Sequence, residues 1–188
     1  VGGMVVTGAN ELVSVLQAPA LLEAARRNAA TVRSLLREST PSRRTRNHHI
    51  LIVDSETCKL YEIYNASFSN GKWKGGSGAI WDLKSNALRP SGWTSADAAG
   101  LPILPGLVRY EEVLAGRIDH AIRFTASSTN SYIWPGRHLT SGQPGVMTNT
   151  PPMGARFRLK ASFDISKYPA KMRVILQAMK TYGIILAD

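Results

Sequence analysis

Most of the residues that could take part in catalysis or ligand binding lie in one window of the sequence, residues 76–125. An apolar stretch is followed there by a long polar loop and then by a second apolar stretch, GRIDHAIRFT, which contains a histidine. A carboxylate and an imidazole can transfer protons, a guanidinium can neutralise an anion, and an indole can stack on a sugar ring. The candidate residues of this window are Asn86, Arg89, Trp93, Asp97, His120 and Arg123.

Two residues further along the chain, Tyr132 and His138, extend this set. The residues expected to transfer protons are Asp97, His120 and His138; those expected to bind substrate are Asn86, Arg89, Trp93, Arg123 and Tyr132. This combination suits the cleavage of a polysaccharide. A glycoside hydrolase needs two carboxyl groups about 5 to 10 Å apart, whereas a lyase on an acidic sugar needs a base and a cation that neutralises the carboxylate.

Each of these residues also has a purely structural interpretation. His120 alternates with Ile118, Ile122 and Phe124, which is typical of a core histidine on a strand. Asp97 can equally cap a turn through its side chain. Among the tryptophans, Trp93 lies in a polar loop and suits sugar stacking best.

A metal site is a further alternative for the histidines. Imidazole suits zinc, copper or iron, so His49, His120 and His138 form the candidate ligand set. No HxH or HExxH spacing supports it. The sequence therefore predicts no cofactor and leaves a divalent metal open.

The chain is strongly basic, with a formal net charge of +10 over 188 residues. Such a charge is either a solvated surface or a sign of an anionic partner. The alternating face of Arg156, Arg158 and Lys160 suits an anionic polymer, and the basic run at residues 43–46 suits nucleic acid less specifically. No stretch is apolar for long enough to predict a helix that spans a membrane.

The elements that must position these residues are mostly strands. Residues 49–54, 58–64, 78–83, 118–124, 132–135, 155–163 and 184–187 show the alternation or the apolar runs typical of strands. Asn-Gly at 70–71 predicts a hairpin, residues 109–116 a short helix, and residues 166–182 a C-terminal helix. We therefore expect a mainly β domain over residues 47–188, a jelly-roll-like β-sandwich with a C-terminal helix.

The N-terminal segment, residues 1–46, differs from the rest in having neither lysine nor aromatic residues. Apolar residues recur there at three- and four-residue steps, which predicts helices at about 10–17 and 19–38 separated by Pro19. We expect a helical segment followed by a basic linker. An amphipathic stripe of this kind more often packs on its own domain than forms an interface, and a dimer formed through residues 10–38 is the alternative.

From residue 48 onwards the sequence resembles a group of uncharacterised, mostly secreted bacterial proteins. The stretches that carry the resemblance are HHILIVD, CKLYEIYNA, GSGAIWDL, SNALRPSGWTSADAAGLPILPGLVRYEEV, GRIDHAIRFT, YIWPGRH, PPMGARFRLKASFDIS and MKTYGIILAD. The resemblance implies a β-sandwich fold and a secreted or cell-surface location, and it implies no particular reaction. Residues 1–46 depart from the group, in which an acidic, proline-rich segment precedes the domain.

Together, these observations favour a carbohydrate-active protein that cleaves a polysaccharide, with an acidic one the best match to its charge. Either a glycoside hydrolase or a polysaccharide lyase would fit the candidate residues. A non-catalytic module that binds glycan or cell wall is the first alternative. A basic protein that binds nucleic acid is the second.

Overall fold

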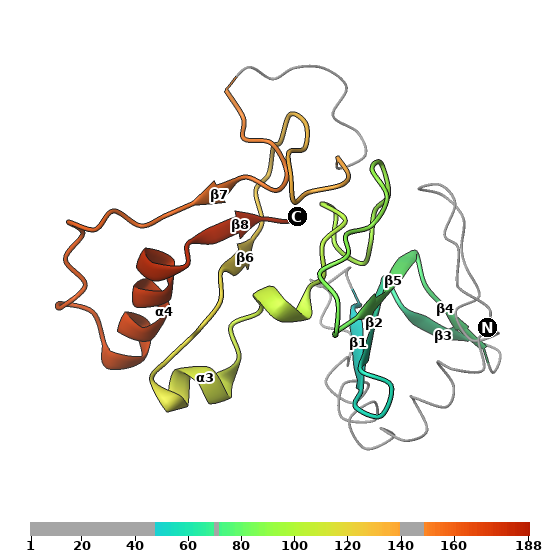
Figure 1. The fold of residues 1–188 in the computed structure, drawn as a ribbon, viewed down its shortest axis with the longest axis horizontal. Coiled ribbons are helices and arrows are strands. Elements are labelled where there is room, and N and C mark those ends of the chain that lie inside the picture. Colours follow the sequence, from blue (N-terminus) through green and yellow to red (C-terminus); the bar gives the residue numbers. More distant parts are fainter. Residues whose placement is uncertain (1–47, 70–71, 140–148) are drawn as a thin grey trace. The chain divides into compact units, whose positions relative to one another are not determined.

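The computed structural model of the chain describes residues 48–69, 72–139 and 149–188 (Figure 1). The helices predicted at 10–17 and 19–38, the basic linker and the dimer contact lie outside these residues. The described chain divides into two compact units. Of the described residues, the first unit comprises 48–69, 72–89 and Thr94–Asp97, and the second comprises Pro90–Trp93, 98–139 and 149–188. The domain boundary expected near residue 46 stays a prediction.

The first unit contains a three-stranded antiparallel sheet in the order β1-β2-β5. Its strands are β1 (Ile50–Asp54), β2 (Lys59–Tyr64) and β5 (Ser77–Asp82). Both long stretches of alternating or apolar residues, 49–54 and 58–64, therefore form strands as predicted. The middle strand β2 is buried on both faces, which its run of Leu60, Tyr61 and Ile63 makes favourable.

A two-stranded antiparallel ribbon, β3 (Ser67–Ser69) and β4 (Lys72–Lys74), completes the first unit. It has the pairing expected of a hairpin at Asn-Gly, although the two turn residues themselves lie outside the described part of the chain. Strands β4 and β5 belong to different sheets, although only two residues separate them. Glycines interrupt the chain between these two strands, and glycine weakens a strand interior.

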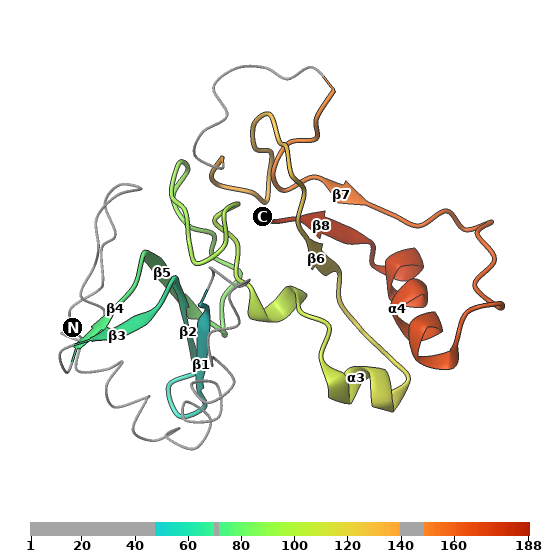
Figure 2. The ribbon, with the colours of Figure 1, turned by 180° about the vertical axis from the view of Figure 1, so that it is seen from behind.

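The second unit is built around a three-stranded sheet in the order β6-β8-β7. Strand β8 (Ile184–Leu186) lies in the middle, parallel to β6 (Ile122–Phe124) and antiparallel to β7 (Arg156–Phe157), as Figures 1 and 2 show. Its core consists of buried residues from distant parts of the chain: Ala99, Leu101, Met153, Leu186 and Ala187.

Two helices and one short 3-10 turn (η2, Leu104–Gly106) accompany this sheet. Helix α3 (Tyr110–Ala115) ends at Gly116, which adopts the left-handed conformation that is common for a glycine after a helix. Helix α4 (Ala170–Thr181) begins after Pro169, later than predicted, because proline favours the first turn of a helix rather than its interior.

Three predicted strands are shorter than expected in the second unit. The strand predicted at 118–124 begins only at Ile122, so His120 precedes it. The strand predicted at 155–163 has two residues, and that at 132–135 is a single bridge between Tyr132 and Met153. Alternation alone does not make a strand without a partner of equal length, and β8 offers only three residues.

The described residues thus form a mixed structure with two small three-stranded sheets and two short helices. The predicted β-sheets and C-terminal helix are present. No sheet among the described residues closes into a barrel, and a mainly β class is too narrow because the second unit contains the helices α3 and α4 beside its sheet. The jelly-roll arrangement is not among the features that the structure shows.

Candidate functional site

The first unit contains four of the predicted site residues, and it connects two of their segments. His49 donates a hydrogen bond from Nε2 to the carbonyl oxygen of Ala96, at 3.0 Å, and its ring lies 5.4 Å from that of Tyr64. Ser77 Oγ donates to the Ser95 carbonyl at 2.7 Å. The segment with Asp97 is therefore fixed to the start of β1 and to β5.

Asp97 itself is buried, with 2% of its surface exposed. Its backbone N–H donates to Ser95 Oγ at 2.9 Å, so the structural alternative, a tight turn with side-chain hydrogen bonds, accounts for this segment well. Arg89 is half-buried, and burial lowers the pKa of its guanidinium. Asn86 is exposed in an irregular stretch. Their roles in catalysis and binding stay predictions.

The second unit brings three predicted site residues into one region. His138 donates from Nδ1 to the Ala98 carbonyl at 3.0 Å. Tyr132 Oη and Ser91 Oγ share a hydrogen bond of 3.0 Å, two residues before Trp93. Gly92 N–H donates to the Arg137 carbonyl at 2.6 Å. The side chains of Trp93, Tyr132 and His138 are all half-buried.

His120 has different partners. Its Nε2 lies 3.1 Å from Glu112 Oε1, and its Nδ1 lies 2.9 Å from the Ala121 carbonyl oxygen. Both ring nitrogens face acceptors, and only the imidazolium form can donate from both at once. In this arrangement His120 links the segment before β6 to helix α3.

Glu112 is the centre of this small network. Its carboxylate also accepts from the guanidinium and from the backbone N–H of Arg109, the residue before α3. Burial alone would raise the pKa of Glu112, but the hydrogen bonds from Arg109 and His120 outweigh it and lower the pKa from 4.5 to about 2. The carboxylate is therefore ionised over almost the whole pH range.

Arg123, the last of the predicted residues, lies in the middle of β6 and is half-buried. The backbone of Gly106 passes so close that an added Cβ there would lie 3.0 Å from Arg123 Cβ. This close approach ties the η2 turn to β6.

No arrangement of metal ligands is present in the described residues. Within residues 48–69, 72–139 and 149–188, no three His, Cys, Asp or Glu side chains are grouped so that they could hold a metal ion. Each of His49, His120 and His138 makes a hydrogen bond to a backbone carbonyl instead.

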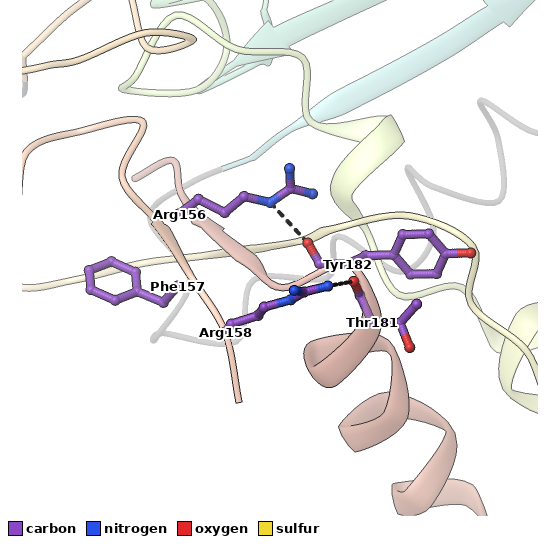
Figure 3. Close-up of a pocket in the computed structure, with 5 residues that line it drawn as sticks. All are labelled: Arg156, Phe157, Arg158, Thr181 and Tyr182. Carbon is purple, nitrogen blue, oxygen red and sulfur yellow. Dashed lines mark hydrogen bonds between the residues drawn. The ribbon is translucent and has the colours of Figure 1, made fainter. Parts of the chain in front are cut away.

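An open pocket of about 390 Å³ lies in the second unit where β7 meets the end of α4 (Figure 3). We call it the arginine pocket, and the residues that line it are Arg156, Phe157, Arg158, Thr181 and Tyr182. Figure 3 shows the two arginine side chains on one side of β7 and the Phe157 ring on the other. The Phe157 ring packs edge-on against Phe124, with ring centres 5.7 Å apart.

The end of helix α4 positions both guanidinium groups. Arg156 Nε donates to the Tyr182 carbonyl at 2.9 Å, and Arg158 Nη2 donates to the Thr181 carbonyl. The last carbonyls of a helix have no partner within it and carry partial negative charge, so cations favour this position. The two arginines are thus held near each other by the helix, and a guanidinium has five N–H donors in all.

The sequence identified only part of this pocket. The alternation of 155–163 indicated a basic face with Arg156 and Arg158, but not the partners Thr181 and Tyr182, which come from a distant helix. Glu112 was likewise missed as the partner of His120. A capping-box pattern at the start of α3 was the one local signal that could have pointed to it.

Comparisons with family models, with curated proteins and with solved structures found no match for the chain. Among the described residues there is also no helix long and apolar enough to cross a membrane.

Proposed function

We propose that the protein binds an acidic polysaccharide, and that the arginine pocket holds carboxylate groups of that polymer. The observation that carries this proposal is the pair of guanidinium groups, Arg156 and Arg158, placed on one side of β7 in an open pocket. A planar guanidinium matches a carboxylate in a bidentate geometry, which a lysine cannot do. The net charge of +10 adds long-range attraction for a polyanion.

The test is a binding titration with a soluble polyuronate and with a neutral polysaccharide as the comparison. Replacing Arg156→Gln and Arg158→Gln should weaken polyuronate binding roughly tenfold each, the effect of losing a charged hydrogen bond. Arg173→Gln is the matched control, because Arg173 is an exposed arginine on α4 outside the pocket. Equal losses in all three variants, or equal binding of the neutral polymer, would refute the proposal.

Cleavage of the bound polymer is the second candidate function. It is favoured by the contact between His120 and Glu112, since a histidine paired with a carboxylate is a common source of acid–base chemistry. Asp97, His120 and His138 stay its proposed catalytic residues. Incubation with polyuronate followed by product sizing decides between the two: shortening of the polymer that His120→Ala abolishes indicates an enzyme, and an unchanged length indicates a binding module.

The proposal also includes a location and a fold. By the resemblance of residues 48–188, we infer a secreted or cell-surface protein with a jelly-roll-like β-sandwich. Binding by the arginine pocket does not depend on that topology. Nucleic acid is the competing anionic partner, and stronger binding of single-stranded DNA than of polyuronate in the same titration would favour it.

A further inference from the structure

Trp134 is the most exposed of the large apolar side chains in the described part of the chain, with 77% of its surface accessible. It lies in the second unit, in a turn at residues 132–136, and its neighbour Ile133 is 50% exposed. Exposing an indole to water is unfavourable. Contact with a ligand would remove this cost, so an exposed tryptophan is a candidate for binding. Tryptophan combines a large flat apolar face with a polar N–H, which suits contact with the face of a sugar ring.

The backbone of this turn is fixed by close contact with the segment around Met153. Ile133 N–H donates to the Met153 carbonyl at 2.9 Å, and Met153 N–H donates to the Ser131 carbonyl at 2.8 Å. Met153 is completely buried in the core. The exposed ring is therefore attached to a rigid base and does not belong to a loosely held loop.

Two glycines allow the chains to approach this closely. A Cβ added at Gly154 would lie 2.3 Å from the Ile133 carbonyl oxygen, and Gly154 has a φ of +85°. A Cβ at Gly136 would lie 2.8 Å from the Met153 carbonyl oxygen. Any side chain at either position would push the turn away, so both glycines serve to hold Trp134 in place.

The turn is also connected to the arginine pocket through the backbone that follows Met153. Met153 contacts the turn, and Arg156 of the pocket follows three residues later, so the connecting backbone spans at most about 11 Å. A short oligosaccharide can cover such a distance. The turn that carries Trp134 is thus hydrogen-bonded to Met153 at one end of the segment 153–156, and Arg156 of the arginine pocket lies at its other end.

We propose that Trp134 is a second contact for the same ligand: it stacks on a sugar ring while the arginine pocket holds a carboxylate on another unit of the chain. This inference rests on the proposed function and adds to it a second contact, so that recognition extends over more than one sugar unit of the polymer. A single uronic acid can occupy one contact but not both.

The experiment measures affinity for a series of oligouronates of increasing length. Trp134→Ala should weaken binding of the long oligomers about three- to tenfold, the range of one aromatic contact, and leave binding of the monomer unchanged. Trp134→Phe should restore most of the loss because it keeps a flat ring. Tyr110→Ala is the matched control, since Tyr110 is an aromatic residue 67% exposed on α3.

The outcomes separate the two proposals. If Arg156→Gln and Arg158→Gln weaken binding but Trp134→Ala does not, the second contact is wrong and the proposed function stands. If no arginine variant changes binding, the proposed function is wrong. A loss with Trp134→Ala that is equal for monomer and long oligomer would also overturn the two-point arrangement. Unchanged circular dichroism and melting temperature confirm that the variants are folded.

Discussion

Glu112 has a role in the second unit that can be measured through pH. Its carboxylate accepts hydrogen bonds from Arg109 and His120, and these hold its pKa at about 2, below the ordinary value of 4.5. A carboxyl group whose pKa is lower in the folded state stabilises that state above its ordinary pKa. This stabilisation is lost as the pH falls from 4.5 towards 2.

We therefore expect the free energy of unfolding to fall more steeply below pH 4.5 in the wild type than in Glu112→Gln. At neutral pH the substitution should cost about 1–2 kcal/mol, because it weakens charged hydrogen bonds to Arg109 and His120. Urea unfolding at a series of pH values measures both effects. Parallel pH dependences for the two proteins would contradict the assigned pKa.

The contacts of His120 also limit how this residue can transfer protons. Both of its ring nitrogens are engaged, with Glu112 and with the Ala121 carbonyl. A histidine that exchanges a proton with substrate needs one nitrogen that faces the substrate. His120 must therefore exchange one of these two contacts for a substrate contact before it can act as acid or base.

Among the elements, the turn at residues 132–136 depends on glycine more strongly than the end of α3. Gly154 and Gly116 both have positive φ, at +85° and +76°. An added Cβ at Gly116 meets nothing within 4 Å, whereas at Gly154 it would overlap the Ile133 carbonyl. An alanine at Gly116 therefore introduces backbone strain alone, whereas an alanine at Gly154 adds steric overlap to it.

Gly116→Ala should lower the free energy of unfolding by only about 1 kcal/mol, the cost of a left-handed conformation. Gly154→Ala should cost clearly more, because the two backbones must also move apart. Chemical denaturation of both variants under the same conditions gives the comparison. Equal losses would mean that the contact between residues 133 and 154 relaxes at no cost.

The elements that the sequence predicted well are those with strong local signals. Alternating or apolar residues located β1 and β2, and a glycine located the end of α3. The stretch 155–163 has an equally regular alternation, yet only Arg156 and Phe157 form a strand. Its partner β8 is three residues long, and no local pattern in 155–163 contains that information.

The same limit applies to the candidate site. Single side chains suited to chemistry were recognisable from their residue types. Their partners were not recognisable. Thr181 and Tyr182 reach Arg156 and Arg158 only through the end of α4, and the segment of Asp97 is fixed to β5 by the hydrogen bond from Ser77 to the Ser95 carbonyl.

For the whole molecule, the net charge of +10 makes binding of a polyanion sensitive to salt. The distance over which charges act shrinks from about 8 Å at physiological salt to about 3 Å at 1 M. We expect polyuronate affinity to fall at least about tenfold over this range, since the attraction is mainly electrostatic.

Stacking on Trp134 is not screened in this way. The loss caused by Trp134→Ala should therefore stay the same in high salt, whereas the losses caused by Arg156→Gln and Arg158→Gln should shrink. Titrations at two salt concentrations provide the measurement. Binding that does not change with salt would exclude recognition by charge.

The central position of β8 also has a consequence for how the protein is made. The strands of the first sheet, β1, β2 and β5, all lie within residues 50–82, so they leave the ribosome close together. By contrast, β6 precedes its partner β8 by roughly 60 residues, a delay of about 3 to 12 s at ordinary rates of translation. During that interval Ile122 and Phe124 have no strand beside them. The nascent chain is therefore most open to chaperones, and to neighbouring chains on the same message, while the second unit waits for its middle strand.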